Sequence, residues 1–461
     1  MIMAILLITG LSLLMYSRTL DYGYVSDDSS IKDSEAPVNK PTNIWWRDLH
    51  RSFMGVCYNN KAVDHAIPLI LHTLNCLLIY FVFGKTSIAL VTALLFLLNP
   101  VNLQAGIGLS GRFYSLSVTV VLLMLLFKII APVFYIAILT FNFSAILAPL
   151  LFLGTDYWYW VLLIPTMIFA YRTRIYNYEW EQTKLKLTTR GLTQMGWWRI
   201  VLGFKTFGYY TLHCLFPRKC GMYHQFMYTY GFTDEDNKKW QKVDKDFWIG
   251  VAVIATVAVG IITNFHGVRY GLLWWCLFIP QWCNFYKMYQ QPVAERYEYL
   301  PNIGLMYALA CLLGPVASLV VLGAYATRTD VQLGMFKDNL KWLEYNLYDF
   351  NFPKQHIAWL FRGLHEREKK RILAAIDCFA HGWEARPHDD KLNFNLGLSL
   401  LEIGQISLAY EHILEAEKNI LELQNGGGGQ MKQIIPQIKA EIEKRLAAKK
   451  EKEDAEKVLS C

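Results

Sequence analysis

Two adjacent carboxylates, Asp27 and Asp28, follow the first apolar run of the chain in the segment Tyr24-Val25-Ser26-Asp27-Asp28. A carboxylate held near a membrane surface can act as a general base by taking a proton from an attacking hydroxyl. A carboxylate pair can also hold a divalent metal, although nothing else in the sequence calls for one. The simpler interpretation is a solvated acidic turn in which Ser26 or Asp27 caps a helix. The residues alone leave these interpretations open.

Further polar side chains lie within apolar runs or at their ends. His72 and Asn75, about one helical turn apart, interrupt an apolar run, where such groups line a cavity or bond across helices. Arg112 and Arg296 lie beside apolar runs, so each could pair with a carboxylate or extend to the interface. The remaining candidates are Asn99, Asn102 and Gln104 after the third run, and Glu295 and Tyr299 before the last run.

The apolar runs predict the helices that position these groups. Of the 461 residues, 54% are hydrophobic, and charged residues gather in 328–461 and a few loops. Because a backbone in lipid must satisfy its own hydrogen bonds, apolar runs of roughly 20 residues predict membrane-spanning helices. The clearest runs are residues 2–16, 66–83, 88–98, 113–131, 197–216, 247–263, 271–285 and 303–326. With two or three more in 132–171, we predict an all-α bundle of about ten or eleven spans.

Residues 328–461 have the composition of a water-exposed helical module. Two windows of 34 residues, 356–389 and 390–423, superpose with small and apolar residues in register. The matched pairs are Gly363 with Gly397, Ala375 with Ala409, Phe379 with Ile413, and Gly382 with Ala416. This pattern resembles the tetratricopeptide repeat, which either binds a protein partner or serves as a spacer. A glycine-rich linker then leads to a predicted capping helix with the apolar stripe Ile434, Ile435, Ile438, Ile442 and Leu446.

The chain is therefore divided into four parts. We predict a transmembrane domain over 1–327, with a first outward loop at 18–65, and a connector over 328–355. Two repeats follow over 356–423, then a linker, capping helix and charged tail over 424–461. The first apolar run lacks a basic leader and a cleavage site, so we expect a retained span. The net charge of +7 is attributed to residues flanking the membrane, and no nucleic-acid partner is expected.

The order of these motifs resembles the transmembrane and tetratricopeptide repeat-containing family, protein O-mannosyltransferases with a GT-C membrane fold. The resemblance rests on Asp27-Asp28, on His72-x-x-Asn75, and on Asn99-Pro100 followed by Gly111-Arg112. Its strongest element is the segment 294–304, AERYEYLPNIG. It implies transfer of a sugar, mannose in this family, from a polyprenyl-phosphate donor to a Ser or Thr hydroxyl of a protein.

The resemblance also implies roles for the candidate residues. Asp27 and Asp28 would supply the base and orient the acceptor, while Arg112 and Arg296 would stabilise the leaving phosphate. The implied substrate cavity is lined by His72, Asn75, Asn99, Asn102, Gln104, Glu295 and Tyr299. The implied partners are membrane lipid, the lipid-linked sugar and a protein bound through the repeats, with no cofactor required. The membrane would be the endoplasmic reticulum in a eukaryote or the inner membrane in a bacterium.

Two departures from the family pattern support an alternative function. Asn99, Asn102 and Gln104 stand where family members usually carry His, His and Glu, and 142–144 lacks their Lys-Glu pair. A catalytically inactive member could serve as a structural or assembly subunit of a membrane complex. A ligase or polymerase of lipid-linked oligosaccharides would use a similar fold on another acceptor. A transporter is disfavoured because the sequence shows no inverted halves with broken helices.

Overall fold

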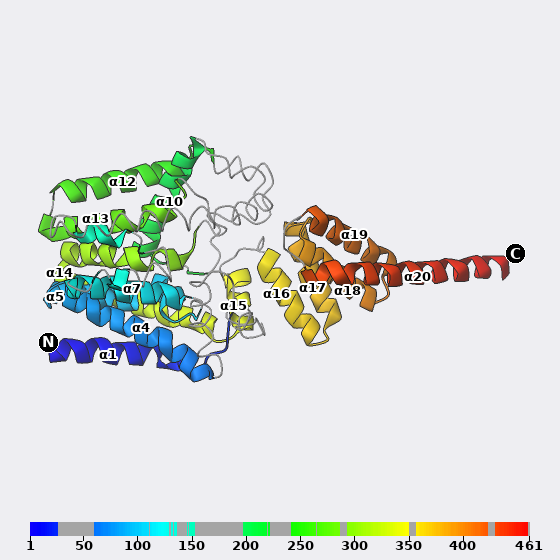
Figure 1. Cartoon of the computed structure of the whole chain (residues 1–461), viewed down its shortest axis with the longest axis horizontal. Coiled ribbons are helices and arrows are strands. Elements are labelled where there is room, and N and C mark those ends of the chain that lie inside the picture. The colour runs from blue at the N-terminus through cyan, green and yellow to red at the C-terminus, as the bar shows by residue number, and fades with distance from the viewer. Residues whose placement is uncertain are drawn as a thin grey trace. The chain divides into compact units, whose positions relative to one another are not determined.

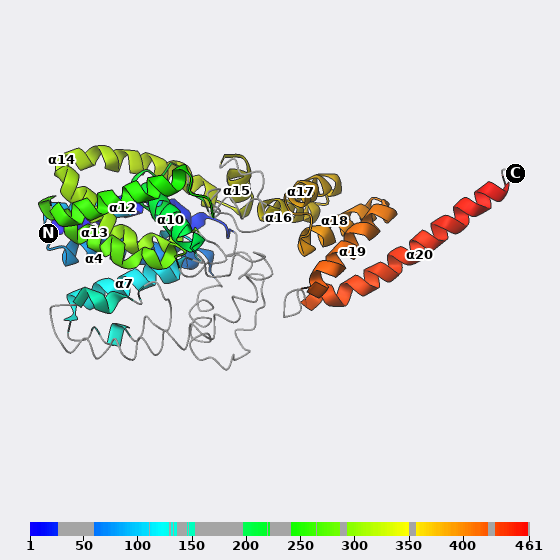
Figure 2. The same ribbon diagram turned by 90° about the horizontal axis from the view of Figure 1, so that it is seen from above.

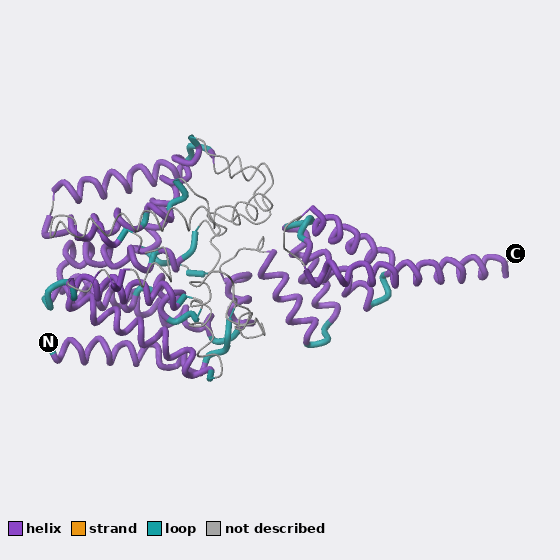
Figure 3. The backbone as a smooth tube through the Cα atoms, viewed as in Figure 1, coloured by secondary structure: helices purple, strands orange, loops and turns teal. Residues whose placement is uncertain are grey.

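The computed structural model describes residues 1–25, 60–109, 111–128, 131, 133–135, 145, 147–152, 197–218, 220–221, 241–263, 265–285, 293–349, 356–422 and 429–459. Every regular element in these residues is a helix, which confirms the predicted all-α class (Figure 3). The chain forms two compact units, a membrane unit that ends at Trp342 and a C-terminal unit over Leu343–Cys461. The predicted candidates Asp27 and Asp28, and the segment 142–144, lie outside the described residues.

The membrane unit consists of helices that run side by side (Figures 1 and 2). Its longer helices are α1 (Ile2–Tyr16), α4 (Lys61–Val82), α5 (Ser87–Leu98), α7 (Arg112–Leu126), α10 (Trp198–Leu215), α12 (Lys245–Thr263), α13 (Val268–Phe278) and α14 (Tyr299–Leu333). Short helices connect or flank them: η1 (Ser17–Asp21), η2 (Pro100–Asn102), α6 (Leu103–Gly106), η5 (Ala148–Phe152), η7 (Phe265–Gly267), η8 (Pro280–Trp282), η9 (Glu295–Tyr297) and η10 (Gly334–Phe336).

Several of these helices have the length and composition of membrane spans. Four described helices qualify, namely Ile2–Asp21, α4, α12 and Tyr299–Phe336, and a fifth is possible if α5 and Pro100–Gly106, bent by 60°, count together. Their outer faces carry exposed apolar side chains such as Leu14 (76% exposed) and Val316 (80%), as expected of surfaces that face lipid. The chain is thus an integral membrane protein. The count of about ten or eleven spans includes helices outside the described residues and stays a prediction.

Helix α14 differs from the single span expected over 303–326. Gly314 has a left-handed backbone (φ 68°) and precedes Pro315, which lacks a backbone donor, so the helix breaks at this pair. Asn302 and Thr329, which would lie about 40 Å apart in a straight helix, both reach the end of α5. Asn302 Nδ2 lies 3.1 Å from Asn102 Oδ1, and Thr329 Oγ1 lies 2.7 Å from the carbonyl of Leu98. The helix expected over 303–326 is therefore present but broken at Gly314, and its two arms fold back on each other.

Glycines bring helices of the membrane unit into close contact. A Cβ atom on Gly208 of α10 would lie 2.7 Å from the Cα atom of Gly250 in α12. Gly271 of α13 and Gly304 of α14 make a similar contact. A Cβ atom on either glycine would clash with the backbone carbonyl of the other. In lipid, where apolar burial contributes little to helix association, such small residues permit backbone-to-backbone packing. The α13–α14 contact holds the start of α14, and with it the preceding η9, against the bundle.

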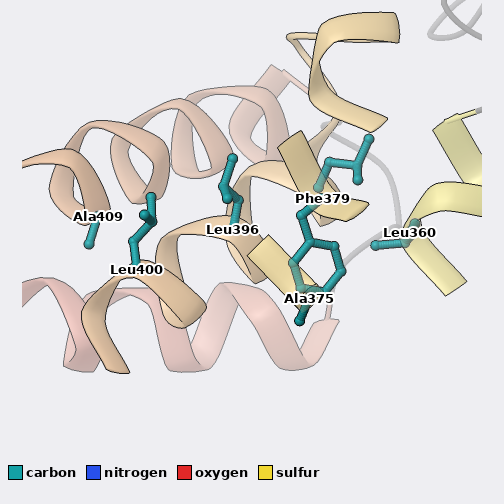
Figure 4. Packing of buried hydrophobic residues seen from close by; sticks show 7 residues of the cluster. Leu360, Ala375, Phe379, Leu396, Leu400 and Ala409 are labelled. Carbon is teal, nitrogen blue, oxygen red and sulfur yellow. The ribbon is translucent and has the colours of Figure 1, made fainter. Parts of the chain in front are cut away.

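The C-terminal unit contains the expected helical pairs. Its helices are α16 (His356–Glu368), α17 (Ile372–Ala385), α18 (Asp390–Glu402), α19 (Ile406–Glu422) and α20 (Gly429–Leu459), preceded by α15 (Asn339–Glu344), which crosses the unit boundary, and the π-helix η11 (Tyr345–Asp349). The first pair, α16 with α17, and the second pair, α18 with α19, share one apolar core (Figure 4). That core contains Leu360, Ala375, Phe379, Leu392, Leu396, Leu400 and Ala409.

The predicted glycine crossings are confirmed. A Cβ atom on Gly363 would lie 2.5 Å from Phe379 Cδ1, and one on Gly397 would lie 2.9 Å from Ile413 Cγ1. The stripe on α20 is confirmed in part, because Ile435 and Ile442 are buried against α19, whereas Ile434 is 43% exposed. Consecutive helical residues point about 100° apart, so only one of Ile434 and Ile435 can face α19.

Candidate functional site

The predicted pair His72 and Asn75 forms a buried hydrogen-bond network with Tyr299. The hydroxyl of Tyr299 lies 2.6 Å from His72 Nδ1 and 3.3 Å from Asn75 Nδ2. Because His72 Nε2 faces the carbonyl of Leu97 at 3.3 Å, the ring proton belongs on Nε2, and Nδ1 accepts from the tyrosine. Thr119 Oγ1 donates to Asn75 Oδ1 at 2.7 Å. The network therefore links α4, α7 and α14, as expected of polar groups that bond across membrane helices.

Asn99 and Asn102 shape the bend between α5 and α6. Asn99 Oδ1 accepts from the Val101 backbone N–H at 3.1 Å, while its Nδ2 donates to the carbonyl of Cys214 at 3.0 Å. Asn102 Nδ2 donates to the carbonyl of Phe96 at 2.7 Å. Both side chains are buried and bonded to other parts of the chain. The asparagines thus hold the bent segment against α10 and α14.

Both arginines are associated with the first turn of α7. Arg112 begins α7 and is 1% exposed, and Tyr114 lies two residues further on. The guanidinium of Arg296 hydrogen-bonds to the Tyr114 hydroxyl, and the Arg296 backbone N–H donates to Gln104 Oε1 at 3.1 Å. Gly111 packs directly on the backbone of Gln104, where a Cβ atom would clash. Gln104 therefore links the loop before α7 to η9, and the predicted phosphate-binding residues lie in one region.

Asp64, which the sequence analysis did not single out, lies in the same region. It occupies the first turn of α4, is 0% exposed, and accepts a hydrogen bond from the Tyr24 hydroxyl at 2.9 Å. Arg112 is close enough to act electrostatically on its carboxylate. Tyr24 precedes Asp27 by three residues in the sequence. We call this region the polar end of the membrane unit, defined by Tyr24, Asp64, Arg112 and Arg296.

A second cluster of ionisable groups joins η9 to the end of α10. Glu298 lies 3.1 and 3.2 Å from His213 Nδ1 through its two carboxylate oxygens, and it accepts from Cys214 Sγ at 2.8 Å. Glu295 Oε1 accepts from the Gly221 backbone N–H at 2.5 Å and lies 4.0 Å from His213 Nε2. Burial raises the pKa of Glu295 to about 8, against the opposing effect of His213. Burial likewise raises the pKa of Glu298.

The predicted site residues thus fall into distinct places. Gln104, Arg112 and Arg296 come together at the polar end, while His72, Asn75 and Tyr299 lie deeper, about 12 Å along α4 from Asp64. The carboxyl group of Glu295 belongs to neither group, because it contacts His213 and the backbone of Gly221. Sequence reasoning missed Asp64, His213 and Glu298. Each of them is a charged or titratable residue in or beside an apolar run, and this feature could have identified it as a candidate.

Part of this chain is similar in sequence to known proteins. The chain is 29% identical over 136 residues to Protein O-mannosyl-transferase TMTC1 of Homo sapiens, an alignment covering 23% of this chain and 15% of that protein. The same protein of Mus musculus matches at 29% identity over 136 residues, with 23% of this chain and 14% of the relative covered. No family model and no solved structure matches. The chain is similar to a small part of a membrane O-mannosyltransferase, which supports a glycosyltransferase-like protein.

Proposed function

We propose that this chain transfers a sugar, by its resemblance mannose, from a polyprenyl-phosphate donor to a Ser or Thr hydroxyl of a protein. The observation that carries the proposal is the polar end itself. Arg112 and Arg296, which are far apart in the sequence, both lie near the first turn of α7. Tyr24, which precedes the Asp27-Asp28 segment by three residues, hydrogen-bonds Asp64 in the same region. The partial similarity to an O-mannosyltransferase supports the same chemistry.

The proposed mechanism assigns one task to each charge. Asp27 or Asp28 takes the proton of the acceptor hydroxyl as its oxygen attacks the anomeric carbon, and the other carboxylate orients the acceptor. The bond to the donor phosphate breaks, and the phosphate gains negative charge. Guanidinium groups stabilise that charge with hydrogen bonds, which is the role proposed for Arg112 and Arg296. Asp64 is proposed as a positioning residue, since its carboxylate contacts Tyr24 and lies near Arg112.

The experiment measures transfer by the full chain in vesicles that contain a mannosyl-phosphate polyprenol and a Ser/Thr-rich acceptor protein. Asp27→Asn and Asp28→Asn are each compared with Asp21→Asn, which removes an exposed carboxylate from the same region. If either residue is the general base, its variant should transfer roughly 10²–10⁴-fold more slowly while Asp21→Asn keeps the wild-type rate. Full transfer by the Asp27→Asn/Asp28→Asn double variant, at a normal protein level, would exclude the pair.

A structural or assembly subunit is the second candidate. The observation in its favour is that Asn99 and Asn102, which stand where the family carries histidines, use their side chains to hold neighbouring helices. On this proposal, wild-type vesicles show no transfer with any polyprenyl-phosphate sugar, and loss of the chain instead reduces the level of a partner protein. The C-terminal unit, with its tetratricopeptide-like pairs, is the proposed contact for that partner or for the acceptor protein.

A further inference from the structure

We propose that His213, Cys220 and Glu295 bind a divalent cation of the zinc class, a site that goes beyond the proposed function. The imidazole, thiol and carboxylate ligand atoms of these three residues all lie within 4.8 Å of one another. His213 Nε2 lies 3.9 Å from Cys220 Sγ and 4.0 Å from Glu295 Oε1. Zinc bonds of about 2.0–2.3 Å in a tetrahedron place ligand atoms roughly 3.3–3.8 Å apart. The two distances from His213 Nε2 therefore need to shorten by only a few tenths of an ångström for its partners to share an ion with it.

The groups around the ligands already orient them for a metal. Glu298 faces His213 Nδ1 through both carboxylate oxygens at 3.1 and 3.2 Å, which places the Nδ1 proton toward Glu298. The lone pair of Nε2 is then directed to Cys220 and Glu295. A histidine ligand whose second nitrogen donates to a carboxylate is a recurring arrangement in metal sites. The Gly221 backbone N–H holds Glu295 Oε1, which fixes the third ligand in turn.

The combination of ligand types selects the class of cation. A sulfur, a nitrogen and one carboxylate oxygen suit zinc and similar first-row ions, whereas magnesium and calcium prefer oxygen alone. Cys220 is 0% exposed, Glu295 1% and His213 8%, so the three groups face one another and not bulk water. An ion there would favour the ionised form of the buried Glu295 carboxyl group. Binding would convert the Cys220 thiol to a thiolate and release its proton to the solvent.

The site would connect two segments that are far apart in the sequence. Cys220 and Gly221 follow α10, while Glu295 opens η9, whose next residue is Arg296. Three ligand bonds would tie the chain after α10 to the short helix that carries one of the two arginines. The inference requires neither a sugar donor nor transfer activity, so it can be tested independently of the proposed function.

The test uses the purified full chain in detergent, stripped of metal with a chelator and then titrated with Co²⁺ and Zn²⁺. Zn²⁺ should bind at about one ion per chain, and Co²⁺ should give an intense near-ultraviolet band from thiolate-to-metal charge transfer. Zn²⁺ should displace Co²⁺ and abolish the band, following the usual order of affinities for such ligands. Absence of any band and of stoichiometric Zn²⁺ in the folded wild-type chain would overturn the proposal and leave a hydrogen-bonded cluster only.

Matched variants assign the ion to these residues. Cys220→Ser should lose the Co²⁺ band, whereas Cys76→Ser, which removes an equally buried thiol from α4, should keep it. Glu298→Gln should weaken Zn²⁺ binding about 10–100-fold through the orientation of His213. A full Co²⁺ band in Cys220→Ser, or its loss in Cys76→Ser alone, would contradict this ligand set. The wild-type titration remains decisive if a variant fails to fold.

Discussion

His356 begins α16 with an imidazole that is 1% exposed. Its Nε2 lies 3.3 Å from the guanidinium of Arg386 and 3.7 Å from a carboxylate oxygen of Asp389. Because a guanidinium can only donate, Nε2 must accept, and the ring is neutral with its proton on Nδ1. Burial, with a further contribution from Arg386, lowers the pKa of His356 well below its ordinary value.

At the residue scale, this predicts that the C-terminal unit loses stability in mild acid. Below pH 6.5 the unfolded chain binds a proton at His356 that the folded chain does not, so the free energy of unfolding falls as the pH falls. The loss should approach about 1.4 kcal/mol per pH unit between pH 6.5 and the lower folded-state pKa. Hydrogen exchange of α16 and α17 in the full chain at pH 7 and pH 5.5 measures it. His356→Gln should reduce this pH dependence, and an unchanged slope in that variant would contradict the assignment.

At the scale of elements, the close crossings of the C-terminal unit depend on two glycines. A methyl group on Gly363 would meet the ring of Phe379, and one on Gly397 would meet Ile413 slightly further away. Gly363→Ala and Gly397→Ala should each destabilise the unit by about 1–3 kcal/mol through overpacking, with Gly363→Ala the larger. The loss of stability is measured by monitoring hydrogen exchange in α16–α19 of the full chain as the temperature is raised.

Gly334→Ala is the control for this pair of substitutions, because a Cβ atom there has no neighbour within 4 Å. It should leave exchange in α16–α19 unchanged. If Gly363→Ala and Gly397→Ala behave like this control, the helical pairs do not cross at these glycines.

At the scale of the whole molecule, the structure determines on which side the chain leaves the membrane unit. The Gly23 backbone N–H donates to the carbonyl of Lys337 at 2.7 Å, and Lys61 Nζ donates to the carbonyl of Asp21 at 2.5 Å. The end of α1, the start of α4 and the segment after α14 therefore lie together. The break at Gly314 explains this arrangement, since it returns the chain to the side on which α14 began.

We therefore expect a tag at Cys461 to face the same compartment as the loop that contains Asp27 and Asp28. Protease protection in sealed vesicles decides this, with a second tag introduced at residue 40 of the loop. Both tags should be protected or cleaved together, while a tag before Met1, across α1, should behave in the opposite way. Cleavage of the Cys461 tag from the side opposite to the loop tag would contradict the topology.

The class of fold can be read from the sequence, because both signals that predict it are local. Apolar runs long enough for lipid predicted helices such as α1 with its bounds intact, and the 34-residue register placed Gly363 and Gly397 at helix crossings. The motif residues Arg112 and Arg296 were also recognised from sequence. Each of these features depends on neighbours along one helix or on a short repeat.

Which of these residues lie together depends on contacts between segments that are distant in the sequence. The fold-back of α14 depends on a backbone conformation at Gly314 that hydropathy does not register, because glycine and proline are common in membrane helices. The contact of Tyr299 with His72, and that of Glu295 with His213 and Gly221, join segments distant in sequence. A buried polar residue can complete a structural network or line a cavity, and its type and spacing are the same in both cases. The two roles are distinguished by which groups of the neighbouring helices the polar side chain contacts.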